Sequence, residues 1–213
     1  MYKQETMQIL EELLLRYPAL TSEKENVYQA FQTLQTALKK GNTVYLCGNG
    51  GSAADCEHIV GELVKSFKKH RALPEELTEN LKKYGAEGEV LIQGLEGGLP
   101  AVSLCGQIAF NTAFGNDKNS ALTFAQAVSS LGKKGDVLLT LSTSGNSQNC
   151  VYAAIVAKAK EMQVVFLGGG TGGKLKSLAD VSVVVPEKET YKVQELHLPV
   201  YHCLCAMLES ENF

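Results

Sequence analysis

The sequence predicts an α/β fold in which an open parallel sheet lies between layers of helices. Short apolar segments that suit buried strands alternate along the chain with segments of helical periodicity. Two of the apolar segments, at residues 43–47 and 136–142, lead directly into runs of small polar residues. Strands that alternate with helices form βαβ units, and continuous apolar strands are typical of a sheet that is covered on both faces.

The N-terminal part of the chain is expected to be helical. Leucines recur at helical spacing over residues 3–17, which predicts a first helix. A second helix is expected to begin at an N-cap formed by Thr21–Ser22 and to end at Lys40, where Gly41–Asn42 stops it. A helical segment, residues 1–41, therefore precedes the first strand.

Five strands and the helices between them complete the predicted order. The helix after the first strand is expected to open at Ser52 and to extend to about Phe67, and the last helix to run from about Thr190 to Ser210. The strands are expected at residues 43–47, 101–104, 136–142, 164–167 and 181–185.

The segment at about residues 68–98 interrupts this alternation. It is rich in lysine and glutamate and closes with three glycines. We expect a charged helix from Pro74 to Tyr84 followed by a loop. A chain of 213 residues suits one domain with this segment inserted.

The composition excludes several classes of function. A net charge of −3 without a cluster of lysine and arginine argues against a nucleic-acid partner. No apolar run approaches the roughly 20 residues that cross a membrane. The polar N-terminus lacks the apolar core of a signal peptide, so we expect a cytoplasmic protein. The six cysteines form no CxxC pair and are expected to be small apolar side chains rather than disulfides or metal ligands.

Two runs of small polar residues, Gly48–Ser52 and Ser142–Ser147, are the candidate binding loops. Each follows a predicted strand, so both lie at the carboxyl ends of parallel strands, where such sheets bind ligands. Their glycines let backbone N–H groups approach an anion, their hydroxyls donate, and a helix N-terminus favours negative charge. Either loop alone is also typical of an ordinary turn. The two together predict a sugar-phosphate site.

Two helices carry side chains that are able to bind a metal or move a proton. His58 and Glu62 are four residues apart, which places them on one helix face. Gln194 and His202 are eight residues apart on the last helix and also share a face. These four side chains are able to complete a zinc site if the helices meet. The alternative is an ordinary helix-face contact and buried core histidines, which is our interpretation of His70 and His197.

These residues resemble a known family. The segment from Gly48 to Asp55, followed by His58 and Glu62, is similar to the first signature of sugar isomerase (SIS) domains. More narrowly, it resembles the bacterial phosphoheptose isomerases, whose phosphate loop is similar to the segment from Asp136 to Ser147. The resemblance spans nearly the whole chain outside the inserted segment. The further matching segments are Gly115-Asn116-Asp117, Gln194-Glu195-Leu196-His197 and His202.

The resemblance implies a five-stranded, flavodoxin-like three-layer sheet and a homotetramer with its sites at subunit interfaces. It also implies one Zn²⁺ in each subunit. The residues that match the family's zinc-binding positions are His58, Glu62, Gln194 and His202. The residues that match its sugar- and phosphate-binding positions are Asn49, Gly50, Gly51, Ser52, Asn116, Asp117, Ser142, Thr143, Ser144, Ser147 and Gln194.

The activity that the resemblance implies is the conversion of sedoheptulose 7-phosphate to a heptose 7-phosphate through an enediol. Glu62 and His202 match the residues that are assigned as general base and acid in the family. Glu62 would relay the carbon proton, and His202 would move protons on oxygen. Zinc, or polar groups alone, would stabilise the developing charge, and the metal and base roles of Glu62 compete.

Two departures from the family pattern leave alternatives open. Tyr191 stands where many members carry a substrate-binding Asp, and the segment at about 68–98 is longer than usual. Both departures are able to change which sugar fits, so an isomerase for another phosphosugar is one alternative. A non-catalytic SIS protein that associates with a replication initiator is another, although a scaffold needs none of the four metal-type side chains.

Overall fold

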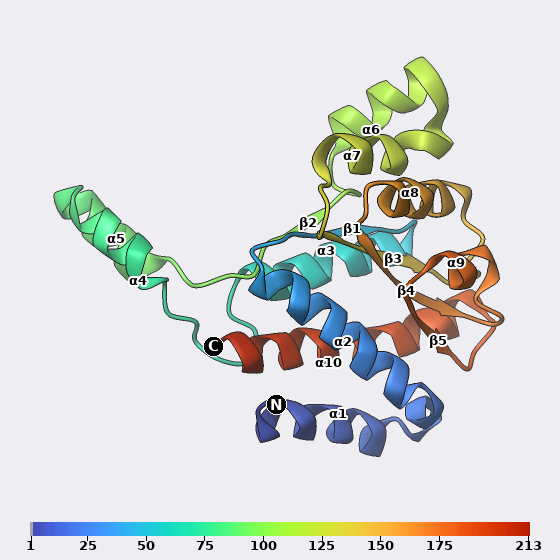
Figure 1. The fold of residues 1–213 in the computed structure, drawn as a ribbon, viewed down its shortest axis with the longest axis horizontal. Helices are drawn as coiled ribbons and strands as arrows, with labels where there is room; N and C mark the ends of the chain where they lie inside the picture. Colours follow the sequence, from blue (N-terminus) through green and yellow to red (C-terminus); the bar gives the residue numbers. More distant parts are fainter. Residues whose placement is uncertain (1) are drawn as a thin grey trace.

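Residues 2–213 are described by a computed structural model and form a five-stranded parallel sheet between two layers of helices (Figure 1). The strands are β1 (Val44–Cys47), β2 (Ala101–Ser103), β3 (Val137–Ser142), β4 (Gln163–Gly169) and β5 (Val181–Val185). Their order is β2-β1-β3-β4-β5, and every neighbouring pair is parallel. The predicted α/β class is therefore confirmed. In this flavodoxin-like order β2 is added on one side of β1 and β3 on the other. The loops that follow β1 and β3 therefore lead to opposite faces of the sheet, and such sheets bind ligands at this point.

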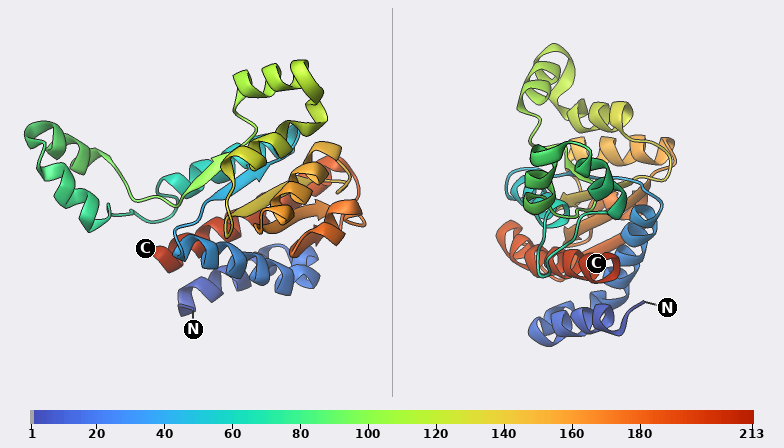
Figure 2. Two further views of the ribbon diagram at one scale, coloured as in Figure 1. Left: turned by 45° about the horizontal axis from the view of Figure 1, so that its top comes forward. Right: turned by 90° about the vertical axis from the view of Figure 1, so that its left-hand side faces the viewer.

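Helices cover both faces of the sheet and enclose an apolar core on each (Figure 2). Strand side chains alternate between the two cores: Val165 and Leu167 of β4 face the first core, and Val164 and Phe166 face the second. Helices α1 (Gln4–Arg16), α2 (Lys24–Lys39), α3 (Gly51–Val64) and α10 (Thr190–Asn212) cover the first face. Helices α7 (Thr123–Leu131), α8 (Gln148–Ala159) and α9 (Gly173–Leu178) cover the second.

The start of the second helix differs from the prediction. Pro18–Glu23 form a 3₁₀ helix, η1, and α2 begins only at Lys24. Pro18 sets the backbone for a helical turn at its own position. The Thr21 hydroxyl donates to the Pro18 carbonyl at 2.7 Å rather than capping α2. The Thr21–Ser22 N-cap was therefore wrong.

The inserted segment holds two helices, α4 (Glu75–Lys82) and α5 (Gly85–Gly94), where one helix and a loop were expected. We call residues 75–94 the α4–α5 arm. Its glycines misled the prediction: a Cβ at Gly88 would lie 2.0 Å from the Leu81 carbonyl oxygen, so this glycine marks close packing of two helices. The arm extends away from the sheet in Figure 1 and in the left view of Figure 2.

A second segment projects from the body on the side of the sheet opposite to α10. It consists of α6 (Ile108–Phe114), a π-helical turn η2 (Gly115–Asn119) and a 3₁₀ turn η3 (Ser120–Leu122). It lies above α7 and α8 in Figure 1. In the part of the chain that the structure describes, no helix combines the length and the apolar character that crossing a membrane requires.

Candidate active site

The first candidate loop follows β1, and its shape depends on its glycines. A Cβ at Gly48 would lie 2.8 Å from the Ser52 carbonyl oxygen, and Gly50 has a φ of 55° that L side chains rarely adopt. A Cβ at Gly51 would lie 2.6 Å from Nε2 of Gln194. The loop therefore closes against α3 and α10, and Gln194 lies beside the start of α3.

The second candidate loop follows β3, the neighbour of β1, so the two loops share one edge of the sheet. The side-chain amides of Asn49 and Asn149 exchange two hydrogen bonds, at 3.0 and 2.8 Å, and so connect the first loop to the start of α8, which follows the second loop. Ser147 precedes α8 without a side-chain capping bond, which leaves N–H groups of that helix available to an anion. The hydroxyl groups at this edge belong to Ser52, Ser142, Thr143, Ser144 and Ser147.

Helices α3 and α10 meet at a cluster of titratable side chains. His58 Nε2 lies 3.2 Å from Glu62 Oε1 and 3.4 Å from His202 Nε2. Glu62 is 13% exposed, and its Oε2 atom accepts no hydrogen bond within residues 2–213, although Lys65 Nζ lies 3.6 Å away. Burial, together with the neighbouring His58, lowers the pKa of His202. The structure thus brings His202 next to His58, which lies 144 residues earlier in the sequence, and to its neighbour Glu62.

A tyrosine and an aspartate fix the orientation of His58. The Tyr201 hydroxyl donates to Asp55 Oδ1 at 3.3 Å and lies 3.0 Å from His58 Nδ1. Because that hydroxyl proton is used, we assign the His58 Nδ1–H as the donor to the Tyr201 oxygen. Nε2 of His58 then points toward Glu62 and His202. Burial raises the pKa of both Asp55 and Tyr201, which keeps the tyrosine a neutral donor.

Sequence reasoning did not single out these two orienting residues. Asp55 precedes His58 by three residues and therefore shares its helix face, which is a signal that helical spacing carries. Tyr201 adjoins His202, but consecutive helical residues do not share a face, so its role depends on how α10 packs against α3.

The donor atoms of the cluster suit zinc in chemical type. Two imidazole nitrogens 3.4 Å apart match the spacing of about 3.3 Å that two ligands adopt on a tetrahedral zinc ion with bonds of about 2.0–2.1 Å. A histidine ligand usually donates its other N–H to a polar partner, as His58 does here. As placed, however, residues 2–213 contain no group of three or more His, Cys, Asp or Glu side chains arranged to hold a metal ion. Metal binding would therefore require side-chain rotation.

A buried ion pair anchors the end of α3, which carries Glu62. Arg71 is fully buried, and its Nη1 and Nη2 donate to the carbonyls of Leu63 and Glu62 at 2.6 and 2.8 Å. Its Nε donates to Glu209 Oε1 of α10 at 2.8 Å. Glu209 also accepts the Phe67 backbone N–H at 2.8 Å. Arg71 thus donates to backbone carbonyls that have no hydrogen-bond partner within the last turn of α3, and its ion pair with Glu209 joins α3 to α10. Neither residue was singled out from the sequence.

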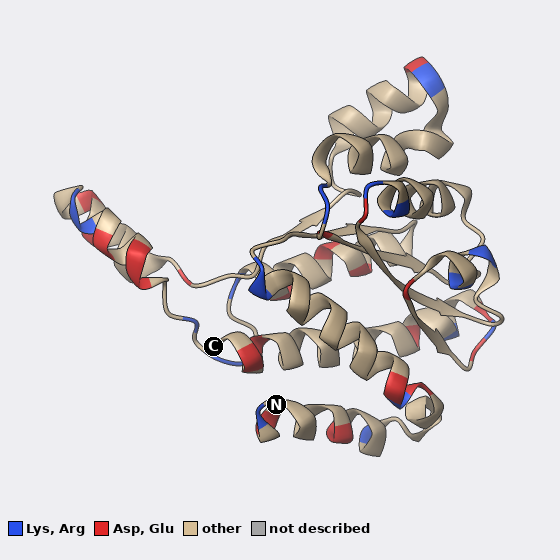
Figure 3. Ribbon diagram, in the orientation of Figure 1, with Lys and Arg blue, Asp and Glu red and all other residues tan. Residues whose placement is uncertain are grey.

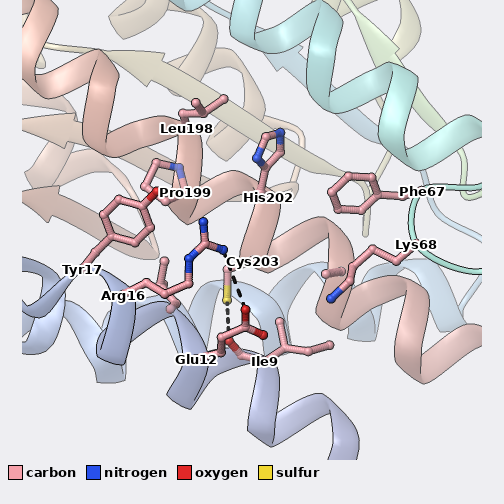
Figure 4. Close-up of a pocket in the computed structure, with 12 residues that line it drawn as sticks. Ile9, Glu12, Arg16, Tyr17, Phe67, Lys68, Leu198, Pro199, His202 and Cys203 are labelled. Atoms are coloured by element: carbon pink, nitrogen blue, oxygen red, sulfur yellow. Dashed lines mark hydrogen bonds and ion pairs between the residues drawn. The ribbon is translucent and has the colours of Figure 1, made fainter.

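A cavity of about 410 Å³ opens beside His202, between α1 and α10 (Figure 4). We call it the α1–α10 cavity. Its walls combine apolar side chains with polar and charged side chains from α1, α10 and the segment after α3. The residues that line it are Ile9, Glu12, Leu13, Arg16, Tyr17, Phe67, Lys68, Leu198, Pro199, His202, Cys203 and Ala206.

Other predicted residues lie elsewhere. Asn116 and Asp117 are exposed on η2, in the projection away from α10, and Asn116 Nδ2 donates to Asp117 Oδ1 at 3.2 Å. Tyr191 is 56% exposed. His197 is buried, as expected of a core histidine, and lies 3.2 Å from the Gly168 carbonyl. His70 is 79% exposed, so its interpretation as a core histidine was wrong; it sits beyond α3 in an irregular segment.

Comparisons with known proteins point to one family. The family model for the SIS domain matches residues 2–97 and 96–169. A phosphoheptose isomerase of Nitratiruptor sp. is 38% identical over 188 residues, which are 88% of this chain and 87% of the relative. A phosphoheptose isomerase of Leptospira biflexa is 35% identical over 206 residues, covering 97% and 94%. Among solved structures, a phosphoheptose isomerase from Neisseria gonorrhoeae matches with a TM-score of 0.72 and 30% identity, covering 97% of this chain and 94% of the other.

Proposed function

The chain belongs to the SIS-domain family, and we propose that it is a phosphoheptose isomerase that converts sedoheptulose 7-phosphate to a heptose 7-phosphate. The observation that carries this proposal is the meeting of His58, Glu62 and His202 on α3 and α10, the two helices against which the first loop closes. Isomerisation between a ketose and an aldose needs a group that moves a carbon proton next to a site for the substrate's anionic end. The two loops lie at the β1/β3 edge of the sheet, and the cluster lies further along α3, the helix that begins at the first loop.

The two loops supply the sites for the phosphate and the sugar hydroxyls. Hydroxyls and amide groups on Ser142–Ser147 and on Asn49 offer neutral donors, and the N-terminus of α8 favours an anion. Gly51 and Gln194 lie together between this edge and the cluster. A sugar phosphate bound here would therefore extend from the loops toward Glu62 and His202.

Glu62 is the proposed base at carbon. Its mostly buried carboxylate has one oxygen beside His58 and one buried oxygen that accepts no hydrogen bond in the described chain, so the capacity of this second oxygen to accept a proton is not used within the chain. His202, whose pKa is lowered, is neutral near pH 7 and is able both to accept and to donate a proton. We assign His202 to proton transfer between O1 and O2 of the enediol.

We also propose that each subunit binds one Zn²⁺ through His58, Glu62, Gln194 and His202. The donor types and the 3.4 Å spacing of the imidazole nitrogens support this proposal. When bound, zinc would supply a positive charge that stabilises the negative oxygen formed during proton transfer. Glu62 remains the group that handles the carbon proton, and Tyr201 with Asp55 holds His58 in its orientation.

The assembly and location that we propose are a homotetramer in the cytoplasm. Asn116 and Asp117 lie on a projection away from the cluster, which supports a site that another subunit completes. The free thiols of all six cysteines, five of them buried, suit a reducing compartment.

Proton NMR of sedoheptulose 7-phosphate in D₂O, with zinc and with a chelator, tests the proposed function. We expect an aldose signal and loss of the C1 proton signal as deuterium enters. A pentose and a hexose ketose phosphate serve as matched substrates. Turnover of one of these alone would show an isomerase for another phosphosugar, and turnover of none by folded protein with zinc would contradict the proposal.

A further inference from the structure

The α4–α5 arm has no apolar core of its own. Gly88 is the one buried residue in the range 75–94, while Leu77, Tyr84 and Val90 are 42%, 69% and 70% exposed. Its helices have 8 and 10 residues, and isolated helices shorter than roughly 12–15 residues are marginal in water. Most helical stability in proteins comes from packing an apolar face. The arm therefore needs a surface to cover that face.

The base of the arm prevents it from folding back onto its own chain. The Gly97 N–H donates to the carbonyl of buried Arg71 at 2.8 Å, and the Ser66 N–H donates to Glu96 Oε2 at 2.9 Å. Both chain segments of the base are thus tied to the end of α3, and through Arg71 to Glu209 of α10. The arm points outward from this anchor (Figure 2). The apolar face of the arm is therefore open to another molecule.

The charge of the arm indicates that its apolar face is covered by the body of a second copy rather than by a second arm. Residues 75–94 contain five glutamates and two lysines, a net charge of −3, which equals that of the whole chain, so the remaining residues carry no net charge. Figure 3 shows the acidic residues along the arm. Two arms side by side would repel each other, but an arm against the body of another copy would not.

The α1–α10 cavity at the base of the arm has the matching character. Ile9, Leu13 and Cys203 give it apolar walls, and Lys68 stands at its edge. The neighbouring charges are already paired, Arg16 with Glu12 and Lys69 with Glu5, whereas Lys68 makes no ion pair within residues 2–213. An acidic helix with an apolar face fits such a surface.

We propose that the α4–α5 arm docks in the α1–α10 cavity of a second copy, whose arm docks in the first in return. Phe67 and Lys68 line the cavity and lead into the arm, so cavity and arm base are neighbours. A single twofold axis that passes between the arm bases of two copies therefore places the arm of each copy on the cavity of the other. Such a reciprocal contact is isologous. His202 also lines the cavity, so the docked arm covers one side of the cluster; this consequence rests on the proposed function.

Photocrosslinking between isotopically distinct copies tests the contact directly. Benzoylphenylalanine replaces Leu77 in ¹⁵N-labelled chains, which are mixed with unlabelled chains, irradiated and digested. We expect mixed-isotope crosslinks from the arm to peptides that contain Ile9 or Cys203. Benzoylphenylalanine in place of Ile155, which is 47% exposed on α8, is the matched control and should not crosslink to these peptides. Crosslinks within one isotope alone, or to another surface, would overturn the proposal.

Variants of the folded protein give a second measurement. Leu77→Asp with Val90→Asp should weaken self-association by at least about tenfold in sedimentation, whereas Ile155→Asp should not. Glu76→Lys with Glu79→Lys should also weaken it, and Lys68→Glu should partly restore it. Equal association of all these variants would refute the docking. Neither measurement uses a substrate, so the arm contact and the proposed function are tested separately. If the crosslinks form but the protein has no isomerase activity, the proposed function is refuted and the arm contact is supported.

Discussion

Helix α3 and the α4–α5 arm follow one another in the chain, yet they are held in place in opposite ways. The apolar side chains of α3, such as Cys56, Ile59 and Leu63, are buried in the core, and Arg71 anchors its end. The arm has one buried glycine and exposed leucines. The proposed catalytic side chains His58 and Glu62 thus stand on the element whose position the rest of the chain determines. The arm is left free to make contacts beyond it.

The largest expected effect comes from breaking the buried ion pair. Arg71→Met removes the donors to Glu62, Leu63 and Glu209 and leaves a buried carboxylate unpaired, which should cost about 3–5 kcal/mol of unfolding free energy. Urea unfolding measures the loss.

The matched control for Arg71 is an exposed ion pair of the arm. Lys82→Met breaks the pair with Glu79, whose side chains are 57% and 61% exposed, and should cost about 0–1 kcal/mol. Equal losses in the two variants would contradict the distinction between α3 and the arm.

The next largest effect is a pH dependence that stems from His197. Burial lowers its pKa to about 4 from 6.5, so the unfolded chain binds the proton first as the pH falls. Its contribution to stability is complete above pH 6.5 and should fall by about 3 kcal/mol between pH 6.5 and 4, at 1.36 kcal/mol per pH unit. Urea unfolding of His197→Gln across this range should show a flatter profile. The exposed His70→Gln should keep the wild-type slope, and a wild-type slope in both variants would rule out His197 as its source.

A smaller, local effect is expected in the arm. Gly88→Ala places a Cβ 2.0 Å from the Leu81 carbonyl oxygen and should separate the two helices, whereas Gly94→Ala meets nothing within 4 Å. Hydrogen exchange over residues 75–94 should accelerate about tenfold or more in the first variant alone. Global unfolding should stay within about 0.5 kcal/mol, because the rest of the chain does not depend on the arm. A large global loss would show that the arm belongs to the cooperative core.

The regular parts of the fold were predictable because strand and helix periods are local properties of the sequence. β5 lies at the residues expected, and the helical spacing of His58 and Glu62 placed both on one face. The second arm helix was missed because Gly85 and Gly88 suggest a loop, although Gly88 serves helix packing.

The side chains that orient the cluster depend on long-range packing, which local patterns do not carry. Arg71 and Glu209 are 138 residues apart, and Asp55 and Tyr201 are 146 apart. The sequence placed His58 with Glu62 on one helix and His202 on another, but it did not show that these two helices, α3 and α10, meet. The zinc ion, the tetramer and the substrate-binding roles of the loop residues stay predictions, since they involve partners outside the single chain.

The central claim is that Glu62 moves the carbon proton in the α3–α10 cluster, and Glu62→Gln tests it most directly. The exchange of deuterium into C1 of sedoheptulose 7-phosphate is followed by NMR, and the affinity for the same compound by calorimetry. We predict that exchange falls by at least about a hundredfold, as loss of a general base requires, while affinity changes by less than about tenfold. Exchange at the wild-type rate with intact binding would contradict the account and remove Glu62 from the mechanism.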